Sequence, residues 1–66
     1  MKKLVYEDIN LKTHFAYKIY SCGYSLSELK YLVYEYNADG RLRSVAEYTS
    51  YDNARKLVSK KCEVTQ

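Results

Sequence analysis

The sequence predicts an α+β domain in which a three- or four-stranded antiparallel sheet is backed by one helix. Three observations indicate this fold. Residues 13–22 alternate between apolar and polar side chains, residues 31–48 contain two β-rich runs joined by a turn, and residues 50–61 have apolar side chains at helical spacing. With 66 residues, no proline and no internal repeat, the chain is expected to form a single small domain with a thin core.

The first part of the chain has the weakest pattern. Residues 1–11 contain a short apolar patch at residues 4–6, which we interpret as either an edge strand or an ordered arm. Residues 13–22 predict a half-buried strand, because successive side chains point to opposite faces of a strand. Its two faces are Phe15, Tyr17 and Ile19 on one side, and His14, Lys18 and Tyr20 on the other.

A hairpin is predicted around the turn at residues 37–41. Gly40 stands where a three-residue loop requires a positive φ, and the residues before it include Asn37 and Asp39. A helix over residues 25–36 is the rival interpretation, since a capping box begins at Ser25 and leucines follow at helical spacing. The tyrosines and valine of residues 31–36 favour a strand instead.

A regular hairpin around this turn predicts which residues face each other. It pairs Tyr36 with Leu42, and Glu35 with Arg43 as an opposite-charge cross-strand pair. The side expected to face the helix contains Leu32, Tyr34, Tyr36, Leu42, Ala46 and Tyr48. The side expected to stay open contains Tyr31, Val33, Glu35, Arg43, Val45 and Glu47.

The helix predicted over residues 50–61 has clear end signals. Thr49 or Ser50 is the expected N-cap, Asp52 lies in the first turn, and two lysines lie in the last turn, where they complement the helix dipole. The face expected to cover the sheet contains Tyr51, Ala54, Leu57, Val58 and Cys62. The side chains expected in solvent are Arg55, Lys56, Ser59 and Lys60.

Composition limits the classes of function. Eleven Lys and Arg against eight Asp and Glu give a net charge of +3, which permits nucleic-acid binding without requiring it. Cys22 and Cys62 are expected to be free thiols in a cytoplasmic protein, since no apolar run has the length of a signal peptide or membrane span. No membrane partner is therefore expected, whereas a homodimer joined edge to edge suits so short a chain.

No catalytic, cofactor-binding or metal-binding residues are predicted. His14 is the only histidine, no glycine-rich phosphate loop is present, and one histidine with two cysteines does not make a familiar metal motif. We interpret His14 as a strand-surface residue and expect a protein that is not an enzyme.

Tyrosines and basic residues are the candidates for binding. A tyrosine ring can stack on a base or anchor a protein interface, but it can also line a thin core with its hydroxyl in water. Basic side chains can contact phosphates, or can simply be solvated. The residues predicted to bind nucleic acid or a partner are Lys18, Tyr20, Tyr24, Tyr31, Arg41, Arg43, Arg55, Lys56 and Lys60.

Short segments between residues 30 and 66 also carry a family resemblance. They are Lys30-Tyr31-Leu32-Val33-Tyr34, Leu42-Arg43-Ser44, Tyr48-Thr49, Ala54 and Glu63-Val64-Thr65. Together they resemble the C-terminal half of the bacterial cell-division modulator CedA and, more loosely, the three-stranded DNA-binding domains of plant ethylene-response factors and some integrases. The resemblance implies a sheet-plus-helix fold that binds DNA or the transcription machinery, with Arg41 and Arg43 near the nucleic acid and Ala54 packing the helix.

Two functional hypotheses follow. The first is a small basic regulator that binds nucleic acid, or a nucleic-acid-handling protein such as RNA polymerase, through the open sheet face and the basic ends of the chain. The second is a protein-only inhibitor or adaptor of the phage type, comparable to an anti-CRISPR or host-takeover protein, which blocks a nucleic-acid enzyme.

Overall fold

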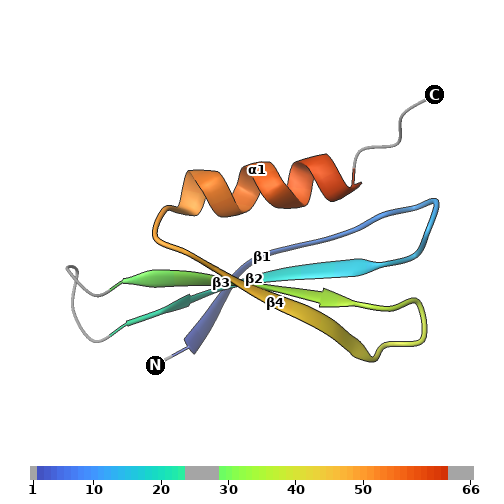
Figure 1. Ribbon diagram of the computed structural model, residues 1–66, viewed down its shortest axis with the longest axis horizontal. Helices are drawn as coiled ribbons and strands as arrows, with labels where there is room; N and C mark the ends of the chain where they lie inside the picture. Colours follow the sequence, from blue (N-terminus) through green and yellow to red (C-terminus); the bar gives the residue numbers. More distant parts are fainter. Residues whose placement is uncertain (1, 24–28, 63–66) are drawn as a thin grey trace.

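A meander of four antiparallel strands followed by one helix makes up the fold (Figure 1). The computed structural model describes residues 2–23 and 29–62. The strands are β1 (Lys2–Ile9), β2 (Ala16–Cys22), β3 (Lys30–Tyr36) and β4 (Leu42–Tyr48), and the helix is α1 (Tyr51–Cys62). The strands lie in the order β1-β2-β3-β4. The predicted α+β fold is confirmed, with four strands rather than three.

The first strand is an edge strand. β1 pairs antiparallel with β2, from Lys2 opposite Cys22 to Ile9 opposite Ala16, with one irregularity between Leu4 and Tyr6. The edge-strand interpretation of residues 1–11 is therefore right for residues 2–9. Because Tyr6 packs against the core, this strand contributes to the body of the domain and is not a loose arm.

The β1–β2 connection is organised by the side chain of Asn10. Its Oδ1 accepts hydrogen bonds from the backbone N–H groups of Lys12 and Thr13, at 2.8 and 3.0 Å, and its Nδ2 donates to the Lys61 carbonyl at 2.7 Å. β2 consequently begins at Ala16, and the expectation of a strand from residue 13 is wrong at its start. His14 is an exposed turn residue with φ of 65°, not a strand-surface residue.

The predicted turn between β3 and β4 is confirmed. The Asn37 N–H donates to the Arg41 carbonyl at 2.8 Å, and the Gly40 N–H donates to the Asn37 carbonyl at 2.9 Å. Gly40 has φ of 90°, in the region that favours glycine. Residues 30–36 form a strand, so the rival helix is wrong there; its start at residues 25–28 lies outside the described residues.

A β-bulge in β4 reverses the predicted faces of β3. Tyr36 lies opposite Leu42 as predicted, but Glu35 lies opposite Ser44, which leaves Arg43 as the extra residue. A shift of one residue moves every following side chain to the other face of the sheet. Ala46 and Tyr48 pack toward the helix as predicted, but they lie opposite Val33 and Tyr31. The residues predicted to face the helix and placed on the other side are Leu32, Tyr34, Tyr36 and Leu42.

The core lies between α1 and the central strands. Its buried residues are Tyr17, Ile19 and Val33 from the sheet and Ala54 and Val58 from the helix. The predicted apolar face of the helix is confirmed for Leu57 and Cys62, which pack at the margin of this core. At the start of the helix, the Asn53 N–H donates to Ser50 Oγ at 3.4 Å, so Ser50 is the N-cap.

Candidate partner-binding surface

One face of the sheet lies against α1, and no other described element covers the opposite face (Figure 1). We call this uncovered side the open face. Strand pairing places a tyrosine cluster at its centre, a rim of apolar residues around the cluster, and charged residues among them. The open face includes the side chains of Lys2, Leu4, Glu7, Ile9, Lys18, Tyr20, Lys30, Leu32, Tyr34, Tyr36, Leu42, Val45 and Glu47.

Three tyrosines from the central strands form the middle of the open face. The rings of Tyr20 and Tyr34 meet edge to face, with centroids 5.1 Å apart and an angle of 76° between the ring planes. The rings of Tyr34 and Tyr36 stack at 6.4 Å and 17°. Each ring therefore limits the movement of its neighbour, and the cluster presents a partly ordered aromatic surface.

Two lysines lie over these rings. Lys2 Nζ is 4.8 Å from the centroids of both Tyr20 and Tyr34, and it donates a hydrogen bond to the Tyr34 hydroxyl at 3.2 Å. This hydrogen bond raises the pKa of Lys2. Lys18 Nζ lies 5.5 Å from the Tyr36 centroid. Cation–π contacts of this kind favour the charged ammonium group at the edge of the cluster.

Exposed apolar side chains surround the tyrosines. Leu4, Ile9, Leu42 and Val45 are 41%, 42%, 52% and 48% exposed. Among residues 2–23 and 29–62 the other large apolar side chains with comparable exposure are Val5, beside the irregularity in β1, and Leu11, in the β1–β2 connection. The exposed apolar surface of the described chain is thus concentrated on the open face.

Charges on the open face are largely balanced. Lys30 Nζ lies 3.6 Å from the Glu47 carboxylate, and Glu7 lies directly opposite Lys18 in the β1–β2 pairing. Of the three lysines on this face, Lys2 alone has neither a carboxylate bonded to it nor one directly opposite in the sheet, over the ranges that the structure describes. Tyrosine, leucine and valine side chains therefore dominate the surface more than charge does.

The structure places the predicted site residues on different surfaces. Lys18 and Tyr20 lie on the open face, as predicted. Tyr31 is on the covered face, with its ring 5.6 Å from that of Tyr51, so its predicted position on an open face is wrong. The predicted position of Arg43 on the open face is also wrong, because its guanidinium lies over the ring of Phe15 at 4.7 Å, and Phe15 packs against the core.

Arg41 is exposed in the β3–β4 turn, where its Nε lies 3.7 Å from the Asp39 carboxylate. Tyr24 lies outside the described residues. The sequence interpretation missed Tyr34 and Tyr36 as surface residues, since only the bulge at Arg43 reveals that β3 turns these two side chains outward. It missed Lys2 because the place of residues 1–11 in the sheet was left open, and only the pairing of β1 with β2 puts Lys2 on this face.

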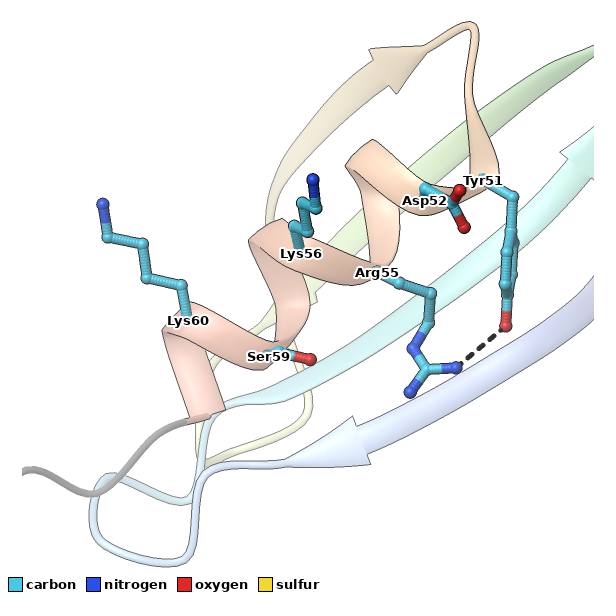
Figure 2. Close-up of a pocket in the computed structure, with 6 residues that line it drawn as sticks. All are labelled: Tyr51, Asp52, Arg55, Lys56, Ser59 and Lys60. Carbon is cyan, nitrogen blue, oxygen red and sulfur yellow. Dashed lines mark hydrogen bonds between the residues drawn. The ribbon is translucent and has the colours of Figure 1, made fainter.

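The basic residues of the helix form a separate surface on the other side of the molecule. Figure 2 shows Lys56 and Lys60 extending from the same side of α1, away from Arg55. The Arg55 guanidinium stacks on the Tyr6 ring at 3.7 Å and donates from Nη1 to the Tyr51 hydroxyl at 3.1 Å. Lys56 and Lys60 are exposed as predicted, but Arg55 is half-buried, which corrects its expected position in solvent.

A crevice of about 200 Å³ opens between α1 and β4 and contains part of the Glu35 side chain. Glu35 Oε2 accepts a hydrogen bond from the Tyr17 hydroxyl at 2.8 Å, and Oε1 accepts one from Ser44 Oγ at 3.0 Å. The predicted ion pair with Arg43 is present at 3.8 Å. Both oxygens of the Glu35 carboxylate thus accept hydrogen bonds within the protein. We therefore interpret this network as a contribution to the stability of the fold.

Cys22 and Cys62 are free and half-buried. Burial, together with the nearby Asp8 carboxylate, raises the pKa of the Cys62 thiol to about 11, which disfavours the reactive thiolate.

Over residues 2–23 and 29–62, no three His, Cys, Asp or Glu side chains are grouped so that they could hold a metal ion. Within the same ranges, the helix is too short and too polar to cross a membrane.

Comparison with known protein families, characterised proteins and solved structures finds no match to this chain. The resemblance to CedA and to three-stranded DNA-binding domains therefore stays a prediction. Function has to be argued from the two surfaces themselves.

Proposed function

We propose that the protein is a small binding module without catalytic activity that docks onto a partner protein through the open face and thereby regulates it. The observation that carries this proposal is the concentration of exposed apolar and tyrosine side chains on one uncovered side of the sheet. Contiguous exposed apolar surface on a small domain marks an interaction site more often than scattered single residues do.

The composition of the open face suits a protein partner. Energetically important residues of protein interfaces are enriched in tyrosine and gather near the centre, surrounded by contacts that exclude water. Tyr20, Tyr34 and Tyr36 occupy such a central position, and Leu4 and Val45 lie beside them in the strand pairing. Since the rings already pack on one another, little side-chain freedom remains to be lost on binding.

Single-stranded nucleic acid is the competing ligand for the same face. The tyrosines would stack on bases, and Lys2 and Lys18 would contact phosphates. The balanced charge argues against this, because Glu7 and Glu47 lie on the same face as the lysines. Phosphate contacts dominate affinity for nucleic acids, and this face offers few unopposed cations.

A nucleic-acid-handling enzyme is the class of partner that we propose. The net charge of +3 is unevenly placed, and the helix carries four basic residues against one acidic residue. A module that attaches by an apolar sheet face would direct this positive helix away from the protein contact, toward any nucleic acid that the partner holds. This arrangement fits an inhibitor or adaptor of such an enzyme.

The test is affinity capture from a nuclease-treated lysate of the cells in which the protein is made. Val45→Glu and Leu42→Glu place a charge on the open face, whereas Leu11→Glu makes the same change at an exposed position in the β1–β2 connection. We expect one specific protein to be captured by the unmodified chain and by Leu11→Glu, and its yield to fall at least about tenfold with either open-face variant.

Equal capture by all three variants would contradict the proposal, as would capture that occurs only when the nuclease treatment is omitted. All three positions are exposed in the free protein, so urea denaturation is expected to show nearly equal stabilities. That measurement separates loss of binding from loss of folding.

A further inference from the structure

We propose that the outer face of α1 binds the phosphate backbone of a nucleic acid. We call this surface the helix face and define it by Arg55, Lys56, Ser59 and Lys60, which line a shallow hollow along the helix (Figure 2). This inference goes beyond docking through the open face, because it assigns a second ligand to a different side of the molecule.

The charges of the helix face are available for a ligand. Lys56 and Lys60 are exposed and stand four residues apart, about 6 Å along the helix axis. The ion pairs found within residues 2–23 and 29–62 join Lys30 to Glu47, Arg41 to Asp39 and Arg43 to Glu35, and none involves these lysines. Asp52, in the first turn, is the one acidic residue of the helix.

Arg55 adds a cation that is held in place. Its guanidinium is stacked on Tyr6 at 3.7 Å and hydrogen-bonded to Tyr51, so it loses little freedom when an anion approaches. The hydrogen bond to Tyr51 raises the pKa of Arg55, which stays charged. A guanidinium has five N–H donors, and one contact to Tyr51 leaves others for phosphate oxygens.

A nucleic-acid backbone fits the helix face better than a membrane or a protein does. Insertion into a membrane surface requires apolar side chains beside the lysines, and the hollow is lined instead by Tyr51, Asp52 and Ser59. A protein interface needs a buried apolar anchor, which this face does not present. Two lysines on one side of the helix, with Arg55 and the Ser59 hydroxyl group on the neighbouring side, match a regularly charged phosphate backbone.

The test is a salt titration of binding to a short fluorescent DNA duplex, followed by fluorescence anisotropy. The unmodified protein is expected to make three phosphate contacts, through Arg55, Lys56 and Lys60. Its affinity for DNA is therefore expected to fall about 40-fold between 50 and 200 mM salt. Lys56→Gln/Lys60→Gln leaves one contact, so the same change in salt is expected to weaken its binding only about 3.5-fold. Lys56→Arg/Lys60→Arg keeps both charges and is expected to retain the steep dependence.

Lys3→Gln/Lys12→Gln is the matched control, because it removes the same net charge from two exposed lysines outside the helix face. It is expected to retain nearly the full salt dependence. The inference would be overturned by equal losses in the two glutamine variants, by the absence of measurable DNA binding, or by binding only to vesicles of phosphatidylcholine and phosphatidylserine. Binding to a single-stranded oligonucleotide, for which three contacts predict a fall in affinity of about 18-fold over the same salt range, would support it equally. Purified DNA replaces the partner protein in this test, so failure of the proposed docking does not affect the outcome, and DNA binding through the open face would leave the salt dependence of Lys56→Gln/Lys60→Gln unchanged.

Discussion

At the scale of single residues, Glu35 is the clearest case of a charged group that the fold must satisfy. Its side chain is 14% exposed, yet three partners from β2 and β4 surround its carboxylate. Burial alone would raise the pKa of Glu35, but the hydrogen bonds from Tyr17 and Ser44 outweigh it and lower the pKa below its usual value. Burial and the bond to Glu35 raise the pKa of Tyr17 to about 12.

Glu35→Gln is expected to lower the free energy of unfolding by about 1–3 kcal/mol at neutral pH, because a charge-assisted acceptor is lost in a partly buried site. A lowered folded-state pKa means that this stabilisation is present above the unfolded value of 4.5 and disappears as the pH falls through the folded value. The difference between the two proteins, measured by urea denaturation, is therefore expected to shrink below pH 4.5.

Glu47→Gln is the control for this prediction, since that carboxylate is exposed and paired only with Lys30. Its effect is expected to stay within a few tenths of a kcal/mol at every pH. A pH-independent loss in Glu35→Gln, or an equal loss in Glu47→Gln, would show that the network does not stabilise the ionised carboxylate.

The sequence predicts part of this network but not all of it. Glu35 and Arg43 face each other in a hairpin whose loop is residues 38–40, so their ion pair follows from the local pattern. The hydroxyl groups of Tyr17 and Ser44 reach the carboxylate because β2 and β4 flank β3 and because the bulge brings Ser44 opposite Glu35. Neither the contact of Tyr17 with Glu35 nor that of Ser44 can be derived from the alternation of side chains along a single strand.

At the scale of elements, Asn10 joins the β1–β2 turn to the end of the helix. It is buried, and its amide makes three hydrogen bonds, two within the turn and one to the Lys61 carbonyl. Asparagine often organises turns by accepting bonds from backbone N–H groups two or three residues ahead. Asn10 is such a turn signal in the sequence. The alternating pattern over residues 13–22 obscured it, because that pattern predicts a strand from residue 13.

Asn10→Asp separates the two roles of this side chain. The aspartate can still accept the turn hydrogen bonds, but it cannot donate to Lys61 and places a negative charge against that carbonyl oxygen. We expect the free energy of unfolding to fall by about 1–3 kcal/mol. Amide hydrogens are expected to exchange faster than in the unmodified protein only in the last turn of α1.

Asn10→Ala removes both roles, so the loss of stability is expected to be larger and the turn amides of Lys12 and Thr13 to exchange faster as well. Hydrogen exchange followed by NMR measures both effects. If Asn10→Asp were as stable as the unmodified protein, the bond to Lys61 would not hold the helix end to the turn.

The bulge at Arg43 shows why the open face was difficult to predict. Apart from β1 and the start of β2, the turn, the strands, the helix and its cap follow from local signals, because each depends on residues close together in the chain. Which side of β3 faces the helix depends instead on a single extra residue in β4. A regular hairpin therefore assigns Tyr34 and Tyr36 to the core and Tyr31 to the surface, and only the strand register shows that these positions are reversed.

At the scale of the whole molecule, a two-layer fold separates two surfaces of different chemistry. The open face is apolar and aromatic with balanced charge, whereas the helix face is basic and polar. In a domain this small, the single helix can cover only one side of the sheet (Figure 1). The proposed module therefore contacts its partner protein with one layer and presents positive charge with the other.

The most direct test of this account is cross-saturation NMR of the labelled module bound to the protein captured from the lysate. Saturation of the partner is predicted to reach the amides of β2 and β3 and the side chains of Leu4, Leu42 and Val45, while α1 remains unaffected. Saturation concentrated on the helix face, with the open face unchanged, would contradict the account.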